Sequence, residues 1–435
     1  MTLLGIDIGS SSVKAGILRG TDVVGKVARR RFDTQYDGVR AEVKPQDILT
    51  AIRRAVADLG AAARRADVIG LSIMSPAWVA MDKSGKPITP IVTHQDRRSV
   101  EVAREIERRV GKARHLRIAG NRPFPGSIGS TTWSWYATHA RSLMRRTDLV
   151  GLLNTFIHRQ LTGARVIDPS NGSFTGVYET TTLAGWSDEL CNAVKMPKSA
   201  LPELLDANRI GGHVTAAGAR RLGVKQGTPV LVGLIDTSSA MLLAGAARGQ
   251  LMNTCGSTDV LAVCTDKPRP HERLLTRALG IGRSWMSVGT IAASGSALNW
   301  CRQTFFSDSS DAEFWKHVAG ANARGADVGL QFEPYLAGER TSIEQRRAAI
   351  AGLTLATTRD DILQALVDAL AKASAERLPL LRSHGVPLKR DVVISGGVQN
   401  GLDKVLHRDW PGQWTFRVED QAALRGLGKL TPTER

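Results

Sequence analysis

Two short turns rich in glycine, serine and threonine have the composition of phosphate-binding loops. The first is Gly9-Ser10-Ser11-Ser12, between two β-rich segments, and the second is Gly256-Ser257-Thr258. Such turns can gather backbone N–H groups and hydroxyls into one concavity that suits phosphate oxygens. An ordinary hairpin turn has the same composition, but the presence of two copies favours a pair of phosphate sites.

Ionisable side chains lie on both sides of the first turn. Asp7 precedes it, and its carboxylate could hold a hydrated Mg²⁺ against phosphate oxygens. Lys14 follows it and would add a positive point charge. The pattern therefore predicts a site for the phosphates of a nucleotide with its metal ion.

Asp236 lies at the end of an apolar segment, 229–235, that we expect to be one continuous strand. Reactive groups of α/β proteins commonly lie at the carboxyl ends of strands. Asp236 could act as a general base that takes the proton of a hydroxyl during its attack on a γ-phosphate. The alternative is a helix N-cap, since Thr237 and Ser238 follow.

A third glycine-rich segment follows the expected strand 391–395. It contains Gly396 and Gly397 and continues to Asn400 and Gly401, where a helix is expected to begin. Glycines at such a position allow the backbone to approach a flat or charged ligand closely. A Gly-Gly turn alone is weak evidence for a site.

The elements that would position these residues alternate between strands and helices, which predicts an α/β protein. Apolar periodicity also places a helix after Pro45, with Asp47 as its candidate cap. The expected strands are 3–8, 13–18, 23–31, 68–74, 229–235, 251–254, 260–263, 391–395 and 415–418, and the expected helices cover 48–59, 102–110, 361–382 and 421–430. The second half repeats the strand, turn, strand pattern of the first, so we predict two similar domains, 1–230 and 231–435.

Composition excludes several classes of protein. The chain has 435 residues, of which 42% are hydrophobic and 23% charged, and this excludes intrinsic disorder. The charge of +17 comes from arginines dispersed along the whole chain, so we expect no nucleic-acid partner. No apolar run approaches the ~20 residues of a membrane span. Four scattered cysteines without a C-x-x-C pair fit a reducing compartment and predict a cytoplasmic protein.

Taken together and in order, the motifs resemble the FGGY family of carbohydrate kinases, and within it the xylulokinase-like enzymes. The resemblance covers residues 3 to about 428. It rests on Asp7-x-Gly9-Ser-Ser-Ser-Val-Lys14, Asp96-Arg97-Arg98, Leu161-Thr162-Gly163, Asp168-Pro-Ser-Asn171 through Trp186, Gly233-x-x-Asp236, Gly256-Ser257-Thr258, Pro334-Tyr335-Leu336-x-Gly338-Glu339-Arg340 and Gly396-Gly397.

This resemblance implies two ribonuclease H-like, actin-like domains with a cleft between them, the sugar mostly on the first and ATP mostly on the second. It also implies Mg²⁺ as cofactor and a homodimer as the common assembly. Asp236 would be the catalytic base and Asp7 the carboxylate near the metal. The residues implied in cofactor binding are Gly9, Ser10, Ser11, Ser12, Lys14, Gly256, Ser257, Thr258, Gly295, Asn299, Gly396, Gly397, Asn400 and Gly401.

The chain departs from the family pattern where the sugar would bind. Met74-Ser75-Pro76 replaces the usual Gln-Met-His type segment, and His94 replaces a usual tryptophan. Together with Asp96 and Asp236, these residues are the candidate substrate contacts. Changed polar contacts alter specificity strongly, because unsatisfied buried polar groups are costly.

We expect ATP-dependent phosphorylation of a sugar hydroxyl, with the terminal hydroxyl of a ketose such as xylulose as the leading acceptor. A polyol or another pentulose or hexulose is the alternative acceptor. A non-catalytic regulator with the same fold, or a cytoskeletal or chaperone-like ATPase, would be the alternative class. The presence of Asp7, Asp236 and both turns argues against the regulator, and segments 168–186 and 334–340 argue against the ATPase.

Overall fold

The computed structural model describes residues 1–324, 329–396 and 400–434, which form two compact units. Unit 1 consists of Met1–Ala246, Cys264–Ser287 and residues 422–434. Unit 2 consists of the described parts of Ala247–Val263 and Val288–Gln421. The predicted boundary near residue 230 therefore lies inside unit 1. The difference arises because two later segments return to unit 1, which local sequence patterns do not reveal.

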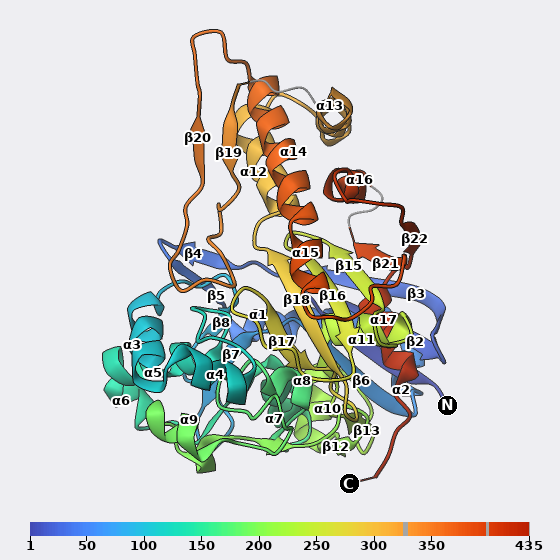
Figure 1. Ribbon diagram of the computed structural model, residues 1–435. Coiled ribbons are helices and arrows are strands. Elements are labelled where there is room, and N and C mark those ends of the chain that lie inside the picture. The colour runs from blue at the N-terminus through green and yellow to red at the C-terminus, as the bar shows by residue number, and fades with distance from the viewer. Residues whose placement is uncertain (325–328, 397–399, 435) are drawn as a thin grey trace. The chain divides into compact units, whose positions relative to one another are not determined.

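A seven-stranded sheet forms the centre of unit 1 (Figure 1). Its order is β12-β13-β6-β1-β2-β3, with β14 also paired to β6. Neighbouring strands β1, β2 and β3 are antiparallel, whereas β6 runs parallel to β1, β13 and β14. The strands are β1 (Leu3–Ile8), β2 (Ser12–Arg19), β3 (Asp22–Arg31), β6 (Val68–Ile73), β12 (Ile210–His213), β13 (Pro229–Leu231) and β14 (Leu234–Ile235).

Side chains on the two faces of β1 belong to two different cores. Leu4, Ile6 and Ile8 pack in the larger core of unit 1, whereas Leu3 packs with residues of the C-terminal segment. Successive residues of a strand point to opposite faces. Asp7 therefore lies on the same face as Leu3, the face that the C-terminal segment covers.

The predicted continuous strand 229–235 is wrong, because it is broken into β13 and β14. Gly233 has a φ of 74°, outside the range of a strand. A Cβ at this position would overlap the backbone carbonyl oxygen of Leu71 on β6. Only glycine permits this close approach without strain, and the break lies three residues before Asp236.

The helix after Pro45 is confirmed as α1 (Pro45–Asp58), but its predicted cap is wrong. Lys44 is the N-cap residue, Pro45 occupies the first turn, and Asp47 lies in the first turn as well. Proline is well suited to this position, because the first N–H groups of a helix lack intrahelical partners. An acidic side chain in the first turn interacts favourably with the helix dipole.

The rest of unit 1 adds a small sheet and further helices. The sheet has the order β4-β5-β8-β7-β9. Its strands are β4 (Gln35–Asp37), β5 (Arg40–Val43), β7 (Ala77–Met81), β8 (Ile91–Thr93) and β9 (Leu149–Leu152). Short strands β10 (Val166–Ile167) and β11 (Glu203–Leu204) form a separate pair. The helices are α2 (Ala61–Arg64), α3 (Val100–Val110), α4 (Lys112–Ala119), α5 (Gly129–His139), α6 (Arg141–Met144), α7 (Leu153–Leu161), α8 (Pro169–Gly172), α9 (Asp188–Ala193), α10 (Ala216–Leu222) and α11 (Asp236–Leu243).

A second sheet, of order β17-β18-β16-β15-β21-β22, repeats the plan of the first. Strands β15 and β16 form an antiparallel hairpin, and β21 lies parallel to β15 on its other side. The strands are β15 (Leu251–Cys255), β16 (Asp259–Thr265), β17 (Leu275–Ala278), β18 (Trp285–Ile291), β21 (Asp391–Gly396) and β22 (Thr415–Val418). The predicted repetition of one plan in the two halves is confirmed.

Helices α12 (Gly295–Phe305), α13 (Asp311–Arg324), α14 (Arg359–Ala375), α15 (Arg377–Arg382) and α16 (Leu402–His407) complete unit 2. Strands β19 (Gln331–Glu333) and β20 (Ala349–Ala351) form an antiparallel pair, and β19 packs beside α14 (Figure 1). The predicted single helix 361–382 is two helices, with the first ending before Glu376. Thr358 and Asp361 form a capping box that starts the first one.

The C-terminal segment returns to the unit that contains the N-terminus. The predicted helix 421–430 is α17 (Ala422–Gly426) followed by a 3₁₀ turn, Leu427–Lys429. Ser239 on α11 donates a hydrogen bond to the carbonyl of Ala423, 2.6 Å away. A Cβ on Gly426 would overlap the Ser239 carbonyl oxygen, so α17 packs directly on α11. Among the described helices of both units, the structure contains none long and apolar enough to cross a membrane.

Candidate active site

Two carboxylates lie at the same edge of the sheet in unit 1. In the parallel strands β1, β6 and β14, Asp7 is level with Ser72, and Ser72 is level with Leu234. Asp236 follows Ile235 directly, at the carboxyl end of β14. The two carboxylates are close enough for the charge of Asp236 to raise the pKa of Asp7. The sheet register thus brings together the two acidic residues that the sequence singled out.

Asp7 is buried, with 5% of its surface exposed, and has two polar partners. Ser72 donates a hydrogen bond to Oδ1 over 2.7 Å, and the Lys14 ammonium lies 3.9 Å from Oδ2. Burial raises the pKa of Asp7, while Lys14 and Ser72 oppose that rise. Lys14 reaches Asp7 because the two residues are directly opposite in the β1–β2 hairpin.

Asp236 is half-buried and is the first residue of α11. Its Oδ1 accepts hydrogen bonds from the backbone N–H of Thr237, at 2.6 Å, and from the Thr237 hydroxyl, at 3.1 Å. The alternative reading as a helix N-cap is wrong, because Ile235 occupies that position. A carboxylate fixed by its neighbour at the start of a helix is well oriented for proton transfer.

The first phosphate-type turn closes with a hydrogen bond from Gly9 N–H to the Ser12 carbonyl, 3.0 Å long. Ser10 is half-buried and Ser11 is exposed. The Ser12 hydroxyl is buried in β2 and accepts a hydrogen bond from Arg29 Nε at 3.1 Å. This hydroxyl therefore helps to join β2 to β3, and the backbone and the other two serines are the groups available for a ligand.

The second turn is supported by the start of α12. Gly256 N–H donates to the Thr258 carbonyl at 3.2 Å, and Thr258 Oγ1 donates to the Ala292 carbonyl at 3.2 Å. Gly295 N–H donates to the Gly256 carbonyl at 3.0 Å. The Ser257 carbonyl also accepts bonds from residues at the start of this helix. Asn299 is exposed on the same helix.

The third glycine segment is partly described. Gly396 has a φ of 103°, and a Cβ there would overlap the Cys255 carbonyl oxygen of the neighbouring strand. Gly397 lies outside the described residues. Asn400 is exposed, and Gly401, with a φ of 78°, is the N-cap of α16. Gly396 is thus required for the close pairing of β15 and β21.

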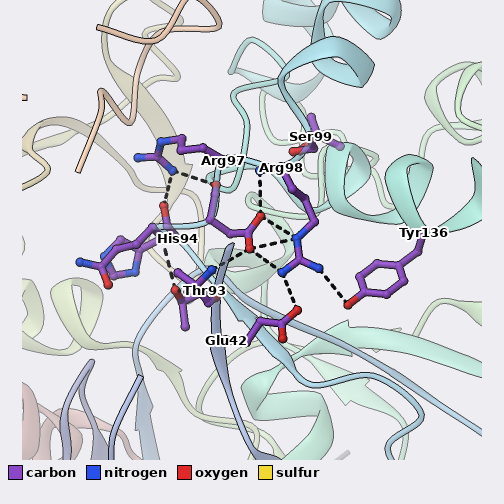
Figure 2. A network of polar contacts seen from close by, with 11 residues as sticks. Glu42, Thr93, His94, Arg97, Arg98, Ser99 and Tyr136 are labelled. Carbon is purple, nitrogen blue, oxygen red and sulfur yellow. Dashed lines mark hydrogen bonds and ion pairs between the residues drawn. The ribbon is translucent and has the colours of Figure 1, made fainter. Parts of the chain in front are cut away.

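Asp96, a predicted sugar contact, is buried and bonds with Arg98, which Figure 2 shows beside Glu42 and Tyr136. Arg98 Nη2 donates to Asp96 Oδ2 at 2.6 Å and to Glu42 at 2.5 Å, and Ala41 N–H donates to Asp96 at 2.9 Å. Arg98 also bonds the hydroxyl of Tyr136, whose pKa burial raises to about 12. Both oxygens of Asp96 are engaged by this chain, and a sugar contact by Asp96 stays a prediction.

The other predicted substrate residues divide into two places. Met74 N–H donates to the carbonyl of Ile8, 2.7 Å away, which brings Met74-Ser75-Pro76 next to the first turn. All three residues are buried. His94 is also buried, and its carbonyl accepts a hydrogen bond from Arg97. The structure therefore groups Met74 with Asp7 and Lys14, and groups His94 with Asp96.

The donor set of unit 1 suits Mg²⁺ bound with a nucleotide. This ion usually takes one or two carboxylates and completes its shell with water and phosphate oxygens. Asp7 provides one such carboxylate beside the first turn. No cluster of three or more His, Cys, Asp or Glu ligands exists among residues 1–324, 329–396 and 400–434. The arrangement fits an ion that arrives with its substrate.

Ser72 belongs to the candidate site and was not predicted from the sequence. It is fully buried and its hydroxyl fixes the Asp7 carboxylate. The signal was present as a single polar residue within the apolar run 68–74. Only the pairing of β6 with β1 shows which carboxylate it bonds.

Comparisons with known proteins show which family the chain is similar to. Residues 2–243 match the N-terminal domain of the FGGY family of carbohydrate kinases, and residues 251–402 match its C-terminal domain. The gluconokinase of Bacillus subtilis (strain 168) is 26% identical over 383 residues, covering 84% of this chain and 74% of that protein. The xylulose kinase of Staphylococcus xylosus is 22% identical and covers 98% of this chain and 90% of that protein.

Solved structures extend the similarity to almost the whole chain. The xylulose kinase from Rhodospirillum rubrum has a TM-score of 0.82 at 24% identity, covering 99% of this chain and 88% of that one. The gluconate kinase from Lactobacillus acidophilus has a TM-score of 0.83 at 18% identity, with the same coverage. These likenesses confirm the predicted α/β fold of two ribonuclease H-like domains.

Proposed function

We propose that this chain, which belongs to the FGGY family of carbohydrate kinases, transfers the γ-phosphate of ATP to the terminal hydroxyl of a ketose such as xylulose. The observation that carries the proposal is the pair Asp7 and Asp236 at one edge of parallel strands, beside a phosphate-type turn. Relatives named as kinases of xylulose, gluconate and glycerol make a polyol or another sugar the alternative acceptor.

In the proposed reaction Asp236 accepts the proton of the sugar hydroxyl as its oxygen attacks the γ-phosphorus. The new oxygen–phosphorus bond forms, the bond to the β-phosphate oxygen breaks, and ADP leaves. The bonds from Thr237 hold the Asp236 carboxylate in a fixed orientation before the hydroxyl arrives. Pre-oriented groups lower the barrier because little reorganisation remains for the transition state.

Charge on the phosphates is stabilised by the hairpin of unit 1. The backbone of the turn 9–12 offers N–H donors, and Lys14 adds a positive charge beside Asp7. We propose that the turn 256–258 binds phosphate oxygens in the same way. Asp7 would hold Mg²⁺, which when bound neutralises phosphate charge and orients the γ-phosphate.

Two features outside the site complete the proposal. The four cysteines are all free and buried, which supports a reducing compartment such as the cytoplasm. A homodimer remains a prediction that rests on the family resemblance alone.

A panel of acceptors tests the proposal. ADP release should be measured with ATP and Mg²⁺ in the presence of xylulose, ribulose, other ketoses, gluconate, glycerol and no acceptor. We expect the largest kcat/KM with a ketose and little release without acceptor. Faster turnover of gluconate or glycerol than of any ketose would overturn the choice of acceptor. Acceptor-independent release as fast as the acceptor-dependent rate would overturn the kinase itself.

A further inference from the structure

A buried serine in unit 1 is hydrogen-bonded to the residue that precedes Asp236. Ser170 lies in α8, and its Oγ accepts a hydrogen bond from the backbone N–H of Ile235 at 3.2 Å. Ser170 is fully buried, and Ile235 is both the end of β14 and the N-cap of α11. N–H groups at the start of a helix have no intrahelical acceptor, so this hydroxyl supplies one.

Ser170 is itself held by a buried carboxylate. Asp168 Oδ2 accepts hydrogen bonds from the Ser170 hydroxyl and from its backbone N–H, the latter at 2.8 Å. Asp168 Oδ1 accepts from Asn171 Nδ2 at 2.6 Å and from Asn154 Nδ2 at 3.2 Å. Because donors of this chain surround both oxygens, Asp168 orients its neighbours and does not need an external ligand.

The segment that returns from residues 264–287 closes over this pair. Gly280 has a φ of 108°, and a Cβ there would lie 3.0 Å from Asp168 Oδ2 and 3.3 Å from the Ser170 Cβ. The Gly280 carbonyl is fixed by a bond from Ala207 N–H, 2.9 Å long. Tight packing of this kind restricts the rotamers of both side chains.

We infer that Ser170, held by Asp168, is a positioning residue that fixes the start of α11 and thereby the direction of the Asp236 carboxylate. This inference rests on the proposed function, in which Asp236 is the base. The line of contacts runs from Asp168 through the Ser170 hydroxyl to Ile235 N–H, one residue from Asp236. Loss of the hydroxyl would leave that buried N–H without its acceptor and free α11 to shift.

The chain offers a matched control in the same short segment. Ser173 is also buried, its Oγ donates to the Pro169 carbonyl at 2.8 Å, and it accepts a bond from Ala278 N–H at 3.0 Å. Like Ser170, Ser173 donates one bond and accepts one from a backbone N–H, although its acceptor is a backbone carbonyl and that N–H belongs to a residue remote in sequence from Asp236. Ser170→Ala and Ser173→Ala should lower the melting temperature by similar amounts.

Steady-state kinetics of the full chain with its best acceptor should separate the two variants. We expect Ser170→Ala to lower kcat about tenfold with little change in the KM for ATP, because the base is displaced and the nucleotide contacts remain. Ser173→Ala should keep kcat within about twofold of wild type. Ser170→Cys, which keeps a weaker donor and acceptor, should give an intermediate kcat and serves as the test if Ser170→Ala does not fold.

A double variant shows whether Ser170 acts through Asp236. In the Asp236→Asn background, Ser170→Ala should cause no further loss of kcat, since the group that it positions is already gone. Equal kcat losses in the Ser170 and Ser173 variants, or an additive loss in the double variant, would overturn the inference and leave the proposed function intact. Normal turnover by Asp236→Asn alone would overturn the base assignment and the inference with it.

Discussion

The two hairpins that carry the glycine-rich turns share one frame and differ in charge. β1–β2 and β15–β16 are both antiparallel, and each has a parallel neighbour, β6 or β21. Asp7, two residues before Gly9, is opposite Lys14 and level with Ser72. The corresponding residue before Gly256 is Thr254, which is opposite Val260 and level with Ser395. Both hairpins have the same strand arrangement, whereas the charged pair of Asp7 and Lys14 occurs only in the first of the two.

Unit 2 has its own charges near the hairpin, but they point into its interior. Asp259 forms an ion pair with Arg377 and accepts a hydrogen bond from Asn253 at 2.6 Å. His407 Nε2 lies 2.6 Å from Asn253 Oδ1. These groups contact one another in the interior of unit 2. An ionisable pair therefore flanks the first turn, whereas uncharged residues occupy the matching described positions of the second.

Loss of the base in unit 1 should have the largest effect. Asp236→Asn should lower kcat for sugar phosphorylation about a thousandfold, because general-base catalysis is removed while the shape is kept. ADP release with the best acceptor measures this loss. ATP should still raise the melting temperature of the variant, and loss of that shift would show that Asp236 acts mainly in nucleotide binding.

Removal of the Asp7 charge should cause the second-largest loss of kcat. A substitution of the matching residue in unit 2, Thr254, provides the control. Asp7→Asn should lower kcat about a hundredfold, since one charged group at the transferring phosphate is lost. Thr254→Val, at the matching position of the second hairpin, should change kcat less than about threefold. Both rates should be measured over a series of Mg²⁺ concentrations. Comparable losses in the two variants would contradict the assignment of the charged site to unit 1.

Substitution of Gly396 tests the packing of the second hairpin. Gly396→Ala should lower the free energy of unfolding by about 2 kcal/mol, because a left-handed residue acquires a Cβ that overlaps Cys255. Gly9→Ala is the matched control, since its nearest contact would be Ser12 O at an ordinary 3.6 Å. Urea unfolding measures both. Equal destabilisation would show that the backbone at Gly396 is no more constrained than the backbone at Gly9.

The smallest expected effect is a difference in how the units respond to acid. Burial lowers the pKa of His407 to about 3, and the positive charge of Arg377 adds to the shift. As the pH falls below 6.5, His407 is therefore protonated in the unfolded chain before it is protonated in the folded one. Stability of unit 2 should therefore fall by about 1 kcal/mol between pH 7 and 5.5. In unit 1 burial raises the pKa of Asp168 to about 6, so the folded state binds this proton more tightly than the unfolded state. A fall in pH from 6 to 3.8 therefore stabilises the folded state of unit 1 through this group.

Hydrogen exchange of the β15 and β1 amides at pH 7 and 5.5, corrected for intrinsic rates, measures this difference. Protection of β15 should fall more than protection of β1. His407→Gln should remove the extra loss in β15, because the group that titrates is absent. An unchanged pH response in that variant would assign the effect to other groups.

Local patterns in the sequence predict most of the strands and both carboxylates, because alternation and turn composition act over a few residues. They miss the break at Gly233, which exists because the backbone of Leu71 approaches from another strand. Likewise, they cannot show that the Asp96 carboxylate is already engaged by Arg98 and Ala41. Contacts between distant segments decide these features, and no local periodicity encodes them.

The residues that hold the carboxylates were the hardest to predict. Ser72 is one polar residue in an apolar strand, and its partner is known only from the register with β1. Ser170 lies in the motif 168–171, which served to recognise the family and gave no indication of a bond to Ile235. Serine hydroxyls bond at short range in space, while these partners are 65 residues apart in sequence.

The return of the C-terminal segment has a consequence for synthesis of the protein. Leu424, Leu427 and Leu430 complete the apolar core that also contains Leu3 and Leu18, and Gly5 lies against Leu424. These leucines follow the other core residues of unit 1 in the sequence, so the face of β1 that carries Asp7 lacks this cover until residues 422–430 have been synthesised. Replacement of Leu424, Leu427 and Leu430 by polar residues would leave the apolar side chains of Leu3 and Leu18 without these neighbours.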